Sequence, residues 1–203
     1  MNLFILAGVI ILSVVIAVAT RRSGNSYARE EQDFWDREHA ANFVRRKSLD
    51  DLDYIVIPTD ELPVSLHHDN DIIVSCTDTI VELAKTEVVN LTGISNTDLK
   101  LKYGTANITS LTLYDQRYTL LASTLQKWAD ELMSLNDVNA ARTVLEYAVS
   151  TGTDVSSTYK SLASIYASNG ETDLIRSLIP KVKALNTPLK DSIIRSLETY
   201  LDQ

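Results

Sequence analysis

Residues 159–170, YKSLASIYASNG, place large and small side chains at intervals that suit one face of an α-helix. Residues three and four positions apart stack along a helix, so one apolar stripe runs from Tyr159 to Tyr166 and includes the small Ala163. Gly170 follows the stripe and can adopt the backbone conformation of a tight turn. The stretch therefore predicts a helix that packs through this stripe and then reverses direction.

The same pattern occurs 34 residues earlier in the chain. In a 34-residue frame that places Tyr159 at position 4, Ala129 coincides with Ala163 and Asn136 coincides with Gly170. The matching positions of the first unit are Leu125, Trp128, Ala129, Leu132, Asn136, Ala141, Leu145 and Ala148. Those of the second unit are Tyr159, Leu162, Ala163, Tyr166, Gly170, Ile175, Ile179 and Val182.

This pattern resembles the tetratricopeptide repeat (TPR), in which two helices carry a large residue, a Leu-Gly/Ala pair, an aromatic and then small residues at fixed positions. The resemblance covers residues 122–187 and implies two helical hairpins that stack on their neighbours to complete a core. Ile175 stands where the family has Ala, so the second hairpin is expected to repack. Pro180 lies inside the second helix of that hairpin and is expected to kink it or end it early.

The whole chain is expected to be mainly α-helical, with four successive parts. Residues 1–20 predict a transmembrane anchor and 21–50 a juxtamembrane helix. Residues 51–112 predict an α-rich first part of the body, and 113–203 the TPR-like hairpins followed by a capping helix. At most one or two short strands are expected near 54–57, where a β-favouring run stopped by Pro58 forms either a short strand or an extended tether lying on the core.

Within the body, the apolar spacing predicts a helix from about residue 70 to 86 and a short one from 95 to 103. Residues 104–112 are expected to connect these to a long helical pattern that begins near residue 115. The amphipathic segment 188–200 predicts the terminal capping helix. Upstream, residues 26–47 predict a helix with basic residues at its end, which either packs on the body or lies at a membrane surface.

The first hydrophobic segment, Leu3 to Thr20, is eighteen residues long and carries no charge. That length is close to the minimum for crossing a hydrocarbon core about 30 Å thick. Arg21 and Arg22 follow at once, and the positive-inside rule places that side in the cytoplasm. The sequence therefore predicts a bacterial-style, single-pass plasma (inner) membrane protein with a cytoplasmic body. The alternative is a cleaved signal sequence, because residues 17–19 resemble a cleavage site.

The charge balance is acidic, with a formal net charge of -8. Residues 51–203 carry twelve Lys or Arg against twenty-one Asp or Glu. Such a body repels phosphate backbones, so nucleic acid is not expected as a partner. Cys76 is the single cysteine of the chain, which rules out an intramolecular disulfide and a cysteine-rich metal site.

The chain offers little catalytic chemistry. The adjacent His67 and His68 lack the spacing that makes two histidines converge on a metal, so they are interpreted as a solvated loop. Cys76 with His39 would be needed for a thiol nucleophile, but Cys76 lies on an apolar helix stripe, which is typical of a structural thiol. Phosphate-binding glycine loops are missing from the sequence. We therefore expect no enzyme, no cofactor, no metal and no small-molecule substrate.

The resemblance instead implies protein binding, because the first helices of successive TPR hairpins line a concave groove for peptides or partner helices. The corresponding groove positions are Gln126, Asp130, Met133, Lys160, Ser164 and Ala167. The predicted function is that of a membrane-anchored cytoplasmic adaptor or scaffold that binds a partner protein. The alternatives are a structural subunit of a membrane complex and an exported cell-surface protein.

Overall fold

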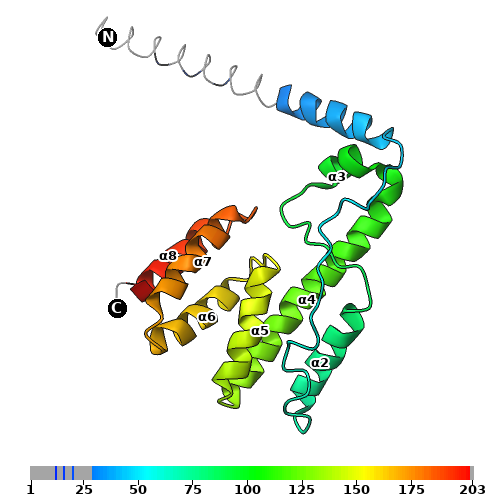
Figure 1. The fold of residues 1–203 in the computed structure, drawn as a ribbon. Coiled ribbons are helices and arrows are strands. Elements are labelled where there is room, and N and C mark those ends of the chain that lie inside the picture. The colour runs from blue at the N-terminus through cyan, green and yellow to red at the C-terminus, as the bar shows by residue number, and fades with distance from the viewer. Residues whose placement is uncertain (1–11, 13–15, 17–19, 21–28, 202–203) are drawn as a thin grey trace, which may run out of the picture. The chain divides into compact units, whose positions relative to one another are not determined.

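The computed structural model describes residues 29–201 and the single positions 12, 16 and 20. The described part is mainly α-helical (Figure 1). The chain divides into two compact units. The described residues of Met1–Lys47 and Asn96–Asn107 form the first unit, and those of Ser48–Ser95 and Ile108–Gln203 form the second, which we call the repeat unit.

The first unit joins a helix at residues 29–42 to α3 (Asn96–Tyr103) and the short 3-10 helix η1 (Thr105–Asn107). The Glu38 carboxylate accepts hydrogen bonds from Lys100 and from Thr97 Oγ1. These bonds hold the pKa of Glu38 below its usual range, with the bond from Lys100 as the largest cause. The sequence predicted that this helix continues to residue 47 with the basic residues 45–47 in its last turn, and this is wrong: the helix ends at residue 42 and the basic residues follow it.

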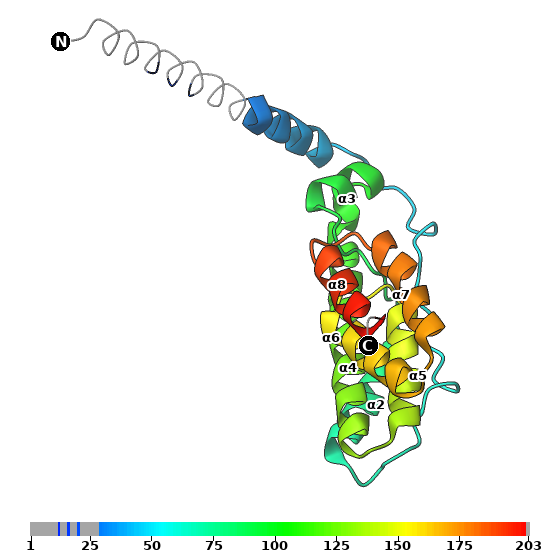
Figure 2. The same cartoon turned by 90° about the vertical axis from the view of Figure 1, so that its left-hand side faces the viewer.

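The repeat unit consists of α2 (Asp71–Leu83), α4 (Ile108–Ser134), α5 (Val138–Ser150), α6 (Ser156–Ser168), α7 (Thr172–Ala184) and α8 (Lys190–Leu201). Helix α4 packs against α2 and α5, and α5 packs in turn against α6. Helices α6, α7 and α8 contact one another at the end of the chain (Figure 2). Helices α2 and α8, together with α3 of the first unit, confirm the helices predicted near 70–86, 188–200 and 95–103.

The helix ends in the repeat unit recur at a spacing of 34 residues. Helix α4 ends at Ser134 and α6 at Ser168. The partner helices α5 and α7 begin at Val138 and Thr172 and end at Ser150 and Ala184. The turn between each pair contains a residue with positive φ, Asn136 at 61° and Gly170 at 74°. The two hairpins predicted from the sequence are thus present, with their helix ends and turns in equivalent positions.

The apolar stripes of the predicted frame form the core of these hairpins. All of its helical positions are buried except Ile179, which is partly buried. The fully enclosed ones include Leu125, Trp128, Ala129, Leu132, Ala141, Leu145, Tyr159, Leu162, Ala163, Ile175 and Val182. The predicted packing stripe is therefore confirmed, while membership of the TPR family stays a prediction.

Of the two alternatives that the sequence left open for residues 54–57, a short strand or an extended tether, the structure shows the tether. Tyr54 and Val89 form one isolated antiparallel bridge. In the described part of the chain, this bridge does not extend into a ladder of several residues. The backbone N–H of Ile55 donates to Val88 O at 2.9 Å. Ile57 is buried in the core just before Pro58 ends the run. The segment is an extended tether on helices because its neighbour pairs over only a few residues.

Two helix boundaries also differ from the prediction. Helix α4 begins at Ile108, directly after η1, so residues 104–112 are not a simple connector. Helix α7 continues through Pro180 to Ala184, so the expected early break does not occur. Pro180 is exposed, where water can solvate the carbonyl group that loses its N–H partner.

The predicted fold class also included an N-terminal transmembrane helix, and this is corrected here. Among the residues that the structure describes, no helix has both the length and the apolar composition needed to cross a membrane. The predicted span, Leu3 to Thr20, lies outside the described residues except at Leu12, Ile16 and Thr20. The fold of the described part is a mainly α-helical one without a transmembrane helix.

Candidate binding cleft

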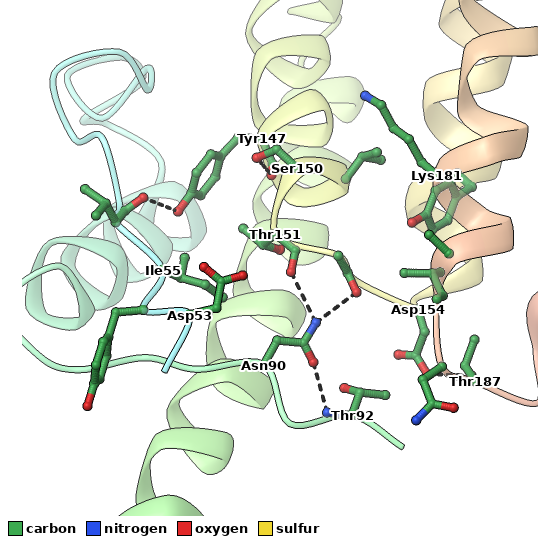
Figure 3. A pocket seen from close by; sticks show the side chains of 18 residues that line it. Asp53, Ile55, Asn90, Thr92, Tyr147, Ser150, Thr151, Asp154, Lys181 and Thr187 are labelled. Atoms are coloured by element: carbon green, nitrogen blue, oxygen red, sulfur yellow. Dashed lines mark hydrogen bonds between the residues drawn. The ribbon is translucent and has the colours of Figure 1, made fainter. Parts of the chain in front are cut away.

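The repeat unit contains an open cavity with a volume of about 760 Å³, which we call the cleft. One wall is the extended segment 53–56, and another is formed by the C-terminal ends of α5 and α7 with the loops that follow them (Figure 3). The lining residues are Asp53, Tyr54, Ile55, Val56, Asn90, Thr92, Tyr147, Val149, Ser150, Thr151, Gly152, Asp154, Tyr159, Lys181, Ala184, Leu185, Asn186 and Thr187.

The two helix ends at the cleft are equivalent in the 34-residue frame. Tyr147 corresponds to Lys181 and Ser150 to Ala184, and in both helices these positions line the cleft. The loop residue Gly152 corresponds in the same way to Asn186. The cleft is therefore built from matching edges of two successive hairpins, with different side chains at each edge.

Asn90 fixes the base of the cleft. Its Nδ2 donates to the carbonyl oxygens of Thr151 at 3.2 Å and Gly152 at 3.0 Å (Figure 3). Its Oδ1 accepts a hydrogen bond from the backbone N–H of Thr92 at 3.0 Å. One side chain thus connects the loop after α5 to residues 90–92, which precede it by about sixty positions.

Two tyrosines stabilise the walls. The hydroxyl of Tyr147 donates to Val56 O at 3.1 Å and ties α5 to the extended segment. The hydroxyl of Tyr159 donates to Thr153 O at 2.8 Å. Burial raises the pKa of Tyr147 to about 12 and raises that of Tyr159 as well, since a phenolate would lose its hydration there. Both phenols therefore stay protonated near neutral pH and act as hydrogen-bond donors.

The charged side chains of the cleft are Asp53, Asp154 and Lys181. Asp154 accepts a hydrogen bond from Thr187 Oγ1 at 2.9 Å, and Asp53 is exposed. In Figure 3 the two carboxylates lie on either side of Asn90, and the ammonium group of Lys181 points away from them. The C-terminal end of α5 adds partial negative charge at the same place, whereas the last turn of α7 contains Lys181 and Lys183.

The side chains and backbone groups of the cleft are mainly hydrogen-bonding ones. The Ser150 hydroxyl donates to Tyr147 O at 2.7 Å, which is a local helix-end contact and not a partnership with a base. Backbone carbonyls, amides, hydroxyls and carboxylates line an open cavity, and such groups can hold the polar atoms of a ligand. Among the described residues, no group of three or more His, Cys, Asp or Glu could hold a metal ion.

The six predicted groove residues lie in different environments. Gln126 is buried: its Nε2 donates to Asp130 Oδ1 at 2.7 Å and its Oε1 accepts from Thr158 Oγ1 at 2.7 Å. Gln126 and Asp130 line a smaller cavity of about 460 Å³, together with Ile72, Ser123, Lys127, Glu131 and Val155. Lys160 is exposed, whereas Met133, Ser164 and Ala167 are half-buried, and none of these four lines that cavity. The groove as a binding surface stays a prediction.

The other residues singled out from the sequence have structural surroundings. His67, expected in a solvated loop, contacts Asp137 Oδ2 through Nε2 at 2.9 Å. Cys76 is buried in α2, and burial raises the pKa of its thiol, which disfavours the reactive thiolate. His39 is exposed on the helix at 29–42.

Sequence reasoning missed the cleft residues. Their one signal was positional: residues 147–152 and 181–186 are equivalent in the 34-residue frame, so the second helices of both hairpins had to end at similar places. The wall formed by 53–56 had no such signal, since its contact with Tyr147 joins residues 91 positions apart. No protein-family model, no curated protein and no solved structure matches the chain.

Proposed function

We propose that the chain is a helical scaffold that binds a partner protein through the surface of its TPR-like hairpins, with the cleft as the binding site. One observation carries this proposal: equivalent ends of α5 and α7 border an open cavity of about 760 Å³ that is lined by hydrogen-bonding groups. Repeat proteins bind partners on surfaces that successive repeats build together. The cleft is such a surface, because both hairpins contribute to it.

The cleft is preorganised for binding. Asn90 fixes the loop after α5, and Tyr147 fixes the extended segment, each through a hydrogen bond to a backbone carbonyl. A partner therefore meets walls that are already ordered, which lowers the entropy cost of association. Val56 is 81% exposed at the edge, where it offers an apolar contact.

Site-specific photocrosslinking tests the proposal. A photoreactive phenylalanine derivative is placed in the full chain at Ala184 in the cleft, at Lys160 in the predicted groove, or at Ser192 on α8; Ala184, Lys160 and Ser192 are exposed. We expect a discrete crosslinked partner from position 184 and none from position 192. A partner captured at position 160 alone would move the binding site to the predicted groove.

A cleft-filling variant provides the matched control. Ala184→Trp, which places an indole in the cleft, is expected to abolish capture from a second probe at Ser150, whereas Ser192→Trp leaves it unchanged. If neither position 184 nor position 160 captures a protein above the level at position 192, the partner-binding proposal fails. The hairpins would then serve only as a structural bundle.

A further inference from the structure

We infer that the partner segment held in the cleft is extended and basic, and that it places a Lys or Arg side chain between Asp53 and Asp154. This inference rests on the proposed function, because it names the chemistry of the partner bound at the same site. It is carried by the charges around the cleft and by the shape of its walls.

The charge balance of the cleft favours a cation. Its lining residues include two carboxylates, Asp53 and Asp154, and one ammonium group, that of Lys181, which points away from both carboxylates. Helices α5 and α7 both end at the cleft; the last turn of α5 has no basic residue, so its C-terminal end carries a partial negative charge that attracts cations, whereas the last turn of α7 contains Lys181 and Lys183. The two carboxylates and the end of α5 therefore act in the same direction, and Lys181 is the one cation among the lining residues.

The hydrogen bonds of the cleft leave acceptors for a cationic donor. The Asp154 carboxylate accepts from Thr187 through Oδ2, and an ionised carboxylate has about four lone-pair sites. Asp53 is exposed and has full acceptor capacity at the entrance. Guanidinium and ammonium groups carry only donors, so they complement this set, whereas a carboxylate of a partner would be repelled.

The walls favour an extended segment over a compact small cation. The stretch 53–56 is itself extended and lies along one side of the cleft, with Val56 exposed at the edge. A chain running beside it can contact Val56 with one side chain and the carboxylates with another, because alternate side chains of an extended chain point to opposite sides. The cavity is also larger than one cationic side chain requires, which leaves room for neighbouring residues of a partner.

Fluorescence anisotropy with defined peptides tests the inference on the full chain. The probes are fluorescein-labelled dodecapeptides of Gly and Ser that carry three Arg, three Lys, three Glu or three Asn at the same positions. We expect the Arg and Lys peptides to bind and the Glu and Asn peptides to bind at least about ten-fold more weakly. Equal affinity for the Glu and Arg peptides would overturn the inference.

Charge variants locate the binding. Asp53→Asn combined with Asp154→Asn is expected to lower the affinity for the Arg peptide by about ten-fold. Asp191→Asn combined with Glu198→Gln on α8 removes the same number of negative charges outside the cleft and is the matched control. Lys181→Glu is expected to strengthen binding of the same peptide, a gain that a folding defect cannot produce. If both double variants weaken binding equally, the peptide follows the general acidic surface and the inference fails.

Two further arms separate the inference from the proposed function. If Ala184→Trp abolishes capture of the crosslinked partner while the Asp53 and Asp154 double variant does not weaken it, the cleft binds a partner without a cationic anchor. The proposed function then stands and the inference fails. Spermidine tests whether a free cation is enough. If spermidine displaces the labelled Arg peptide at the same concentration as an unlabelled Arg peptide does, the inference that the bound segment is an extended chain is overturned.

Discussion

At the residue scale, Ala163 tests the hairpin packing. It is fully enclosed in α6, which packs against α5, α7 and α8. Ala163→Leu adds three carbon atoms to a filled space, so we expect the free energy of unfolding to fall by about 1–3 kcal/mol. Lys160→Leu on an exposed turn of the same helix is the control, expected to change it by less than about 0.5 kcal/mol. Urea unfolding of both variants gives the comparison, and equal losses would contradict the packing.

The buried Gln126 and Thr158 pair allows a second test at this scale. Thr158 is fully enclosed, and its hydroxyl donates to Gln126 Oε1 across α4 and α6. Gln126→Met leaves that hydroxyl without its partner, which is expected to cost about 1–3 kcal/mol. Thr158→Val in the same chain removes the orphaned donor and should restore most of the loss. A double-mutant cycle that shows additive losses would mean that the two side chains do not depend on each other.

At the element scale, two glycines in turns offer a matched comparison. Both have positive φ, 78° at Gly93 and 74° at Gly170. A Cβ at Gly93 would lie 2.1 Å from Asn186 O, whereas at Gly170 it would meet nothing within 4 Å. Gly170→Ala therefore costs only the backbone strain, about 1 kcal/mol, and Gly93→Ala should cost clearly more. Thermal unfolding of the two variants measures the difference, and a similar loss for both would contradict the close approach of the loops.

The capping contacts at the N-terminus of α5 should make the free energy of unfolding depend on pH in the acid range. Asp137 caps this helix by accepting from Ala140 N–H and also contacts His67. These contacts lower the pKa of Asp137, with the His67 hydrogen bond as the largest cause. A lowered folded pKa gives stability that is present above the unfolded pKa and is lost as pH falls through the folded one. Stability should therefore decline below about pH 4.

Asp137→Asn keeps a capping side chain but cannot titrate. The free energy of unfolding of this variant should vary less with pH in the acid range than that of the wild type. His67→Asn is the second arm, since Asn tolerates the positive φ of 53° at this position. If both variants keep the acid slope of the wild type, other carboxylates set that slope.

The helices could be predicted from the sequence because their signals are local. Tyr159, Leu162 and Ala163 define a face within one turn, and Gly170 marks the reversal close by. The start of α4 at Ile108 could not be predicted from the sequence, because the apolar residues of the Thr-rich segment 109–112 show only weak helical spacing. Helix formation in this segment depends on the long helix that follows it. The choice between a strand and a tether at 54–57 could not be made from the sequence for a similar reason: β-favouring residues form a ladder only if a neighbour pairs along their length.

At the scale of the whole molecule, the charge could be counted from the sequence but the cleft could not be placed. Asp53, Asp154 and Lys181 are far apart in the chain and come together only because the repeat unit folds. Hydrogen bonds such as that from Asn90 to Gly152 span 62 positions, and no local pattern encodes them. Residues 51–203 nevertheless contain an excess of acidic residues, twenty-one against twelve basic ones, so their net charge is negative, as is the net charge of the side chains that line the cleft.

That excess gives a kinetic prediction for the full chain. An acidic body attracts a basic segment from a distance and raises its association rate, whereas dissociation depends on the contacts made within the cleft. The Debye length is about 10 Å at 0.1 M salt and about 3 Å at 1 M, so salt screens the approach more than the bound state. Stopped-flow measurement with the Arg peptide should show an association rate that falls about ten-fold between 50 mM and 500 mM NaCl, with a much smaller change in dissociation. An association rate independent of salt would show that the acidic surface does not steer the segment toward Asp53 and Asp154.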